Sequence, residues 1–219
     1  MTAKRIARGE AGSITIASSG ASSYGFLPRL VTLATAEMHD VDLVLLEMVT
    51  TAQVEALAAN RLDLGLVRMP IDRRGLGIIC VQREPLMVAV PKNHPLADGR
   101  QPTVRDLDRQ DFIMYSPSEG RYFHDLVTSV LRAAEVMPNF VQYIHQIHTI
   151  LALVGVGMGI ALVPESAQAL NFDGVVLRTL RLSPKAFAEL HLVWRRSNDN
   201  PALHRFRDLV THKFLENSP

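Results

Sequence analysis

Hydroxyl-bearing residues and one arginine follow three apolar stretches in the first third of the chain. They are Ser18, Ser19, Ser22 and Ser23 after the first stretch, Thr50 and Thr51 after the second, and Arg68 after the third. Hydroxyl groups and the backbone amides at a helix start are suitable donors to a carboxylate, and an arginine adds a fixed positive charge. These residue types therefore predict an anion-binding site. The alternative role for Thr50 is helix capping, and Arg68 could equally lie on the surface or in an internal ion pair.

The catalytic motifs that the sequence approaches do not fit their required contexts. A nucleophile elbow needs Gly-x-Ser-x-Gly, and in Gly20–Gly25 the second glycine comes one residue late. The glycines of 155–159 follow a predicted helix and precede a predicted strand, the reverse of a dinucleotide-binding turn. Glu119, Asp125 and Glu165 have no spacing typical of a catalytic pair. We expect no enzyme activity and no cofactor.

The residues that could bind a metal are few and scattered. Cys80 is the only cysteine, which excludes an internal disulfide and a multi-cysteine metal site. Its apolar neighbours favour a small buried residue over a nucleophile. His145 and His148 are three positions apart but have no nearby Asp or Glu, so we expect one to be buried, one to be solvated, and neither to bind metal.

Composition places the chain among ordinary globular proteins. Its 219 residues are 47% hydrophobic and 21% charged, which excludes a disordered chain or a coiled coil and suits one large domain or two small lobes. The formal net charge of +1 lacks the basic excess expected of a nucleic-acid-binding domain. No secretory signal is recognisable in 1–10, and the apolar run 147–164 is interrupted by glycines and polar residues. We expect a cytoplasmic protein.

Hydrophobic periodicity in the first lobe predicts alternating strands and helices. The expected strands are 12–17, 42–48 and 64–67, with a helix over 26–38 and a second that starts at a Thr50–Gln53 capping box. This order predicts parallel strands, since helices provide their crossovers. The run 42–48 is nearly all apolar, as expected for a sheet covered on both faces. Two further strands, 78–82 and 86–90, precede a proline-containing crossover at 91–96.

The same alternation continues in a second lobe. Its expected elements are strand 112–115, loop 116–121, helix 122–134, strand 139–143, helix 147–154 and strands 160–163, 175–178 and 189–195. The final helix, 202–215, is expected to pack on the first lobe. Two α/β lobes connected by two crossing segments predict a cleft for a small ligand at the carboxyl ends of strands.

Five stretches, in order, resemble the effector-binding domain of LysR-type transcriptional regulators. They are Gly12-Ser13-Ile14-Thr15-Ile16-Ala17, Phe26-Leu27-Pro28-Arg29-Leu30, Leu62-Asp63-Leu64-Gly65-Leu66, 86–96 and 157–164. The resemblance implies an α/β fold of two Rossmann-like lobes, type 2 periplasmic-binding-protein-like. It divides the chain into a linker-helix remnant (1–11), lobe I (12–91 and 196–219) and lobe II (92–195).

Two stretches, 47–57 and 61–68, are similar to the branch of this family that senses muconate and benzoate in aromatic-compound catabolism. The branch implies effector contacts from the loop after the first strand, the second helix start and the second lobe. Together with the residues that follow the strands, the effector-binding set is Gly20, Ala21, Ser22, Ser23, Thr50, Thr51, Arg68, Phe123, Gln146 and Ile147. The sequence departs from the branch at Ala21, often Ser, and at Gln82, where some members place the Arg of a second benzoate site.

The resemblance also implies partners. Family members form side-by-side antiparallel homodimers, and the full-length proteins can form tetramers. They bind DNA through an N-terminal domain, and residues 2–10 resemble only the end of the helix that follows it. A solute-binding protein of a transporter has the same architecture and is the alternative function. The effector, the target operon and the direction of regulation stay open.

Overall fold

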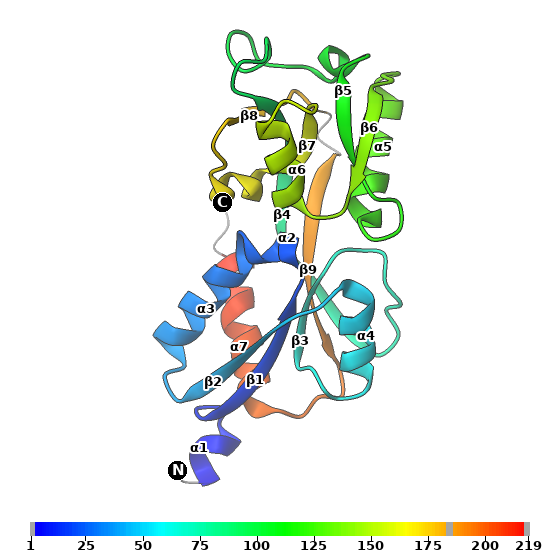
Figure 1. Ribbon diagram of the computed structural model, residues 1–219. Coiled ribbons are helices and arrows are strands. Elements are labelled where there is room, and N and C mark those ends of the chain that lie inside the picture. Colours follow the sequence, from blue (N-terminus) through cyan, green and yellow to red (C-terminus); the bar gives the residue numbers. More distant parts are fainter. Residues whose placement is uncertain (1–2, 183–185, 217–219) are drawn as a thin grey trace. The chain divides into compact units, whose positions relative to one another are not determined.

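The computed structural model describes residues 3–182 and 186–216, and it confirms the predicted α/β class (Figure 1). Two compact units are present. Unit 1 comprises residues 1–82 and 189–219, and unit 2 comprises residues 83–188. In the described part of the chain, no helix is both long enough and apolar enough to cross a membrane.

The sheet of unit 1 is built on three parallel strands. β1 (Gly12–Ser18) pairs in parallel with β2 (Val41–Glu47) on one side and β3 (Leu64–Val67) on the other. β9 (Phe187–Arg195) is antiparallel to β3 and lies next to β4 (Leu76–Pro91). Successive side chains of a strand face opposite sides, so each strand contributes to two separate cores.

Helices cover both faces of this sheet. α3 (Phe26–Glu37) and α7 (Pro201–Thr211) lie side by side on the face of Ile14 and Ile16 (Figure 1). α4 (Thr50–Ala58) packs on the opposite face, against Ala17 and Val67. The remaining helical segments of unit 1 are α1 (Ala3–Ala7), α2 (Gly20–Ser23) and a π-helical turn over His212–Glu216.

Unit 2 contains the second half of β4, which is antiparallel to β7 (Ala161–Pro164) and β8 (Val175–Thr179). A parallel pair, β5 (Asp111–Tyr115) and β6 (Asn139–Ile144), forms a second sheet. The helices are α5 (Arg121–Ala133) and α6 (Ile147–Gly155), with 3-10 turns over Val104–Leu107 and Glu165–Leu170.

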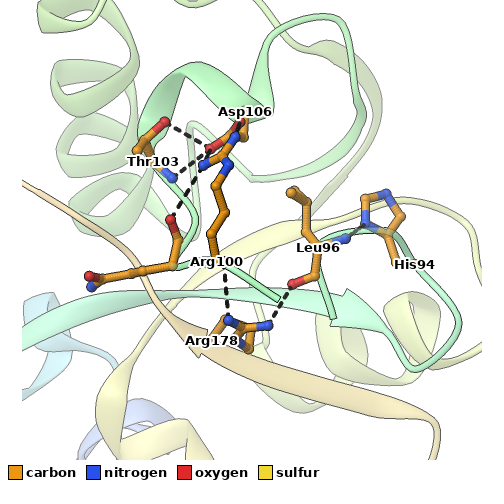
Figure 2. Close-up of polar contacts among 7 residues, drawn as sticks. His94, Leu96, Arg100, Thr103, Asp106 and Arg178 are labelled. Carbon is orange, nitrogen blue, oxygen red and sulfur yellow. Dashed lines mark hydrogen bonds and ion pairs between the residues drawn. The ribbon is translucent and has the colours of Figure 1, made fainter. Parts of the chain in front are cut away.

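Polar contacts fix the segment between β4 and β5 within unit 2, and Figure 2 shows several of them. Arg178 of β8 donates to the carbonyl oxygens of Leu96 at 3.3 Å and Arg100 at 3.2 Å, and outside the figure to that of Gly99 at 2.9 Å. The Asp106 carboxylate accepts from the backbone amide of Thr103 at 2.8 Å and forms an ion pair with Arg100. These contacts, with Arg100 the larger cause, hold the pKa of Asp106 well below its ordinary value.

The two strands predicted at 78–82 and 86–90 are one continuous strand, β4. The intervening Glu84 and Pro85 favour a break, but Glu84 is buried and its carboxylate accepts the backbone amide of Ser166 at 2.7 Å. A partnered charge is tolerated inside a fold. β4 and β9 both cross the division between the two units, which lies at 82/83 and 188/189. The lobe boundaries 91/92 and 195/196 that the resemblance implies stay a prediction.

The predicted burial of both faces of β2 is wrong for the single chain. Val44, Leu45 and Leu46 are 44%, 46% and 39% exposed. β2 is the terminal strand of its sheet, with β1 as its partner. The apolar side chains of this terminal strand are therefore left exposed in the single chain.

Candidate functional site

The register of unit 1 brings the predicted anion-binding segments to one edge. Ser18, the last residue of β1, is opposite Glu47 at the end of β2 and Leu66 near the end of β3. The amide of Met48 continues the ladder by donating to the carbonyl of Ser18 at 2.9 Å. The turn after β1, the start of α4 and Arg68 therefore follow neighbouring strand ends, as parallel pairing predicts.

The turn after β1 forms the short helix α2 (Gly20–Ser23), where a loop was expected. The hydroxyl of Ser22 is buried, accepts from the amide of Ser19 at 3.1 Å and donates to the carbonyl of Ser19 at 2.8 Å. This hydroxyl closes the turn, so Ser22 positions the backbone around it. The side chains of Ala21 and Ser23 lie outside the described part of the structure.

The predicted capping box at Thr50–Gln53 does not form. The residue before α4 is Val49, Thr50 is the first helical residue, and no side chain caps the helix there. The first backbone bond runs from the amide of Gln53 to the carbonyl of Val49 at 3.0 Å. The amides of Thr50, Thr51 and Ala52 precede it and give the helix start its preference for anions. The side chain of Thr50 is half-buried and that of Thr51 is exposed.

Gln53 positions this helix start, a role that its place in the predicted capping box did not reveal. Its side chain is fully buried, and Nε2 donates to the carbonyls of Met48 at 2.8 Å and Leu66 at 3.2 Å. One amide group therefore connects the chain after β2 to β3. The signal available in the sequence is a polar residue at a core-facing helix position.

Arg68 is 6% exposed, which makes the alternative of a surface arginine wrong. It lies beside β9, where Val67 is paired with His191. The pKa of His191 is lowered, first by burial and then by the positive charges of Arg73 and Arg68, against an opposing effect of Glu189. The edge of unit 1 at the carboxyl ends of its parallel strands thus contains a buried positive charge, Arg68.

Unit 2 has a corresponding edge at the ends of β5 and β6. Tyr115 is paired with Ile144, and the amide of Ser116 donates to the carbonyl of Ile144 at 3.0 Å. Gln146 precedes the first residue of α6, Ile147, which is 2% exposed. The predicted Gln146 and Ile147 thus lie at a helix start, with the isoleucine side chain in the core.

Phe123 lies on the first turn of α5 and is 6% exposed. Its ring stacks on Tyr115, with centroids 5.0 Å apart, and meets Tyr122 edge-on at 5.1 Å. Most of its surface is therefore used in packing within unit 2.

The two histidines near this edge are both exposed, which corrects the prediction that one is buried. Nδ1 of His145 lies 3.2 Å from Oε2 of Glu119 in the loop before α5. Sequence reasoning did not connect these residues, because their contact depends on the β5–β6 pairing.

The LysR substrate binding domain family matches residues 7–215 of the chain. The chain belongs to this family. The uncharacterized HTH-type transcriptional regulator YnfL of Escherichia coli K12 is 30% identical over 211 residues, covering 94% of this chain and 69% of that protein. The HTH-type regulator BenM of Acinetobacter baylyi is 29% identical, covering 94% and 68%.

Solved structures agree with the family assignment. The BenM effector binding domain with its effector benzoate superposes with a TM-score of 0.83 at 26% identity, covering 95% of this chain and 96% of that one. CbnR, a LysR family regulator, has a TM-score of 0.86 at 23% identity, covering 94% and 71%, and supports the fold alone. The predicted type 2 periplasmic-binding-protein-like fold is confirmed.

LysR membership fixes the class of function. The chain is the effector-binding domain of a LysR-type transcriptional regulator, and its relatives are regulators, which confirms the prediction that it is not an enzyme. Membership of this family also favours a regulator over the alternative function, a solute-binding protein of a transporter.

Proposed function

We propose that this LysR domain senses a small carboxylate of the muconate or aromatic-acid class, and that unit 1 binds the carboxylate group. The observation that carries the proposal is the convergence of the Ser19–Ser22 turn, the start of α4 and buried Arg68 at the ends of three parallel strands. Backbone amides, a threonine hydroxyl and a guanidinium group are all donors, which suits an acceptor-only ligand. BenM, whose structure contains benzoate, supports the aromatic-acid class.

We further propose that Gly20, Ala21, Ser22, Ser23, Thr50, Thr51 and Arg68 form the effector set of unit 1, and that Phe123, Gln146 and Ile147 form that of unit 2. Thr50 is the residue expected to donate its hydroxyl to the ligand, because it is the first residue of α4 and its side chain is half-buried. Ser22 acts by shaping the turn. Phe123 and Ile147 are 6% and 2% exposed, and we propose that their small accessible apolar surface selects the hydrocarbon part of the ligand.

The experiment is a thermal-shift and calorimetric comparison of benzoate, muconate and salicylate with benzamide, which lacks the negative charge. A ligand at 100 times its dissociation constant stabilises a protein by about 2.7 kcal/mol. Thr50→Ala is expected to weaken carboxylate binding by roughly 10- to 150-fold, since a hydrogen bond to a charged group contributes roughly 1.5–3 kcal/mol. The matched control is Thr35→Ala, an exposed threonine on α3. The proposal would be contradicted if benzoate and benzamide bound with equal affinity, or if Thr50→Ala left the carboxylate affinity unchanged.

We also propose that the domain pairs with a second copy through its two uncovered strands, as the side-by-side dimer of the family implies. β2 exposes Val44, Leu45 and Leu46, and β6 exposes Phe140 and Tyr143, which are 42% and 50% accessible. Contiguous exposed apolar residues mark interaction surfaces. We propose a cytoplasmic location as well, which is supported by the family's role as regulators that act on DNA.

Sedimentation of Leu45→Glu tests this pairing. The charge is expected to convert dimers to monomers, whereas Val156→Glu, at an apolar residue 78% exposed outside these strands, should leave the dimer intact. A monomeric parent chain at every concentration, or equal effects of both variants, would exclude these strands as the interface.

A further inference from the structure

Three side chains with metal-binding atoms lie together on the sheet of unit 1. Cys80 is on β4, and Glu189 and His191 are on the neighbouring strand β9. One ligand atom from each lies within 4.8 Å of the other two. Glu189 and His191 are two positions apart, so their side chains leave the same face of β9. The pairing of β4 with β9 supplies the thiol from a distant part of the sequence.

The donor set suits a borderline-soft divalent cation. A thiolate, an imidazole and a carboxylate are all ligands of Zn²⁺, at roughly 2.0–2.3 Å from the ion, so two ligands of one tetrahedral ion are about 3.3–3.8 Å apart. Nε2 of His191 and Oε2 of Glu189 are 3.9 Å apart, close to this spacing. The remaining separations, up to 4.8 Å, need the side chains to move together by about 1 Å to reach it. Three protein ligands leave one coordination position for water or another donor.

His191 gives an independent indication that a partner belongs here. The residue is 9% exposed, Nδ1 is buried and has no hydrogen-bond partner within residues 3–182 and 186–216, and Nε2 lies 3.9 Å from Oε2 of Glu189. The contact with Glu189 is longer than a hydrogen bond. A buried imidazole nitrogen without a partner is costly, and coordination of a cation at Nδ1 would remove that cost.

The surrounding charges favour a metal that bonds strongly to sulfur. Arg68 and Arg73 both act electrostatically on His191 and repel a cation. The thiolate of Cys80 and the carboxylate of Glu189 supply two negative charges that neutralise a divalent ion. Hard cations such as Mg²⁺ gain little from a thiolate ligand, so this environment discriminates against them.

We propose that Cys80, Glu189 and His191 form a binding site for a thiophilic divalent cation, with Zn²⁺ as the ion that the three donors fit best. The site ties β4 to β9 within unit 1 and uses none of the residues of the proposed effector set. It goes beyond the sensing of a carboxylate and does not depend on it. It also replaces the expectation, from sequence spacing, that the chain has no metal site.

The test uses the whole chain, reduced and stripped of metal with a chelator, and Co²⁺ as a spectroscopic probe. Binding of one Co²⁺ per chain is expected, with a thiolate-to-metal charge-transfer band in the near ultraviolet and the strong visible bands of a tetrahedral ion. Zn²⁺ should displace Co²⁺, and Mg²⁺ should not. Because no carboxylate is added, the result is independent of the effector experiment.

Variants assign the ligands. Cys80→Ser should abolish the charge-transfer band, and Glu189→Gln and His191→Gln should weaken Co²⁺ binding by more than about tenfold, since even outer-shell changes cost 10–100-fold. His39→Gln, at an exposed histidine of unit 1, is the matched control, and circular dichroism verifies folding. If Cys80→Ser does not fold, Glu189→Gln keeps the assignment testable. Absence of the charge-transfer band in the parent chain, or equal Co²⁺ affinity in parent and Glu189→Gln proteins, would overturn the proposal.

Discussion

Both units place a helix start at the carboxyl end of parallel strands, but they hold that helix in different ways. In unit 1 the start of α4 is held by the buried amide of Gln53, which donates to the carbonyls of Met48 and Leu66. In unit 2 the start of α5 is held by the ring of Phe123 stacked on Tyr115. Hydrogen bonds fix particular atoms, whereas stacking fixes a surface. Unit 1 is therefore suited to orient donors, and unit 2 to shape an apolar wall.

The largest expected effect comes from removing the aromatic stack. Phe123→Ala should lower the free energy of unfolding by about 3–5 kcal/mol, because a buried ring is replaced by a cavity. Chemical denaturation measures it. A loss below 1 kcal/mol would show that the ring contributes little to packing and leave ligand contact as its main role. Phe123→Leu, which keeps most of the side-chain volume, should weaken the binding of aromatic acids more than the binding of short aliphatic acids.

Breaking the polar attachment of α4 should cost less. Gln53→Leu keeps the side chain's approximate size but leaves the carbonyls of Met48 and Leu66 without this donor. The free energy of unfolding should therefore fall by about 1–3 kcal/mol. The same denaturation experiment applies. Benzoate affinity should also fall, because the amides of α4 lose their fixed position. Unchanged affinity would show that Gln53 supports the fold without orienting the site.

Thr50→Ala should change stability by less than about 0.5 kcal/mol, since its side chain does not cap α4. Its predicted effect on carboxylate affinity is therefore separable from folding. A loss of more than 1 kcal/mol in thermal or chemical unfolding would instead support a structural role for the hydroxyl.

The smallest effect is expected at the exposed ion pair of unit 2. The pKa of Asp106 is held below its ordinary value of 3.8 by Arg100 and Thr103, so the folded state favours the ionised carboxyl. The resulting stabilisation is complete above pH 3.8 and is lost as the pH falls towards the lowered pKa. Asp106→Asn should flatten the acid limb of the stability curve, and Asp98→Asn, an exposed residue of the same segment, should not. If the free energy of unfolding depended on pH in the same way in the parent and Asp106→Asn proteins, the contribution of Asp106 to acid stability would be excluded.

Local patterns predicted most elements of the fold. The alternation in Gly12–Ser18 and the helical spacing of Phe26, Leu30 and Leu33 were sufficient, because these residues face a core on a regular period. The continuous strand β4 was not predictable, because the burial of Glu84 depends on the amide of Ser166 far along the chain. Likewise, no local signal shows that Gln53 reaches Leu66.

The sequence by itself determined the α/β class, the order of the elements and the resemblance to LysR effector-binding domains, since these follow from local periodicity and short motifs. Only the tertiary structure decided which side chains share a surface. It brought Cys80 beside His191, buried Arg68 and Phe123, and left the apolar strand β2 uncovered. The physical reason is that burial and partnership are properties of pairs of distant segments, and strand register and helix packing set those pairs.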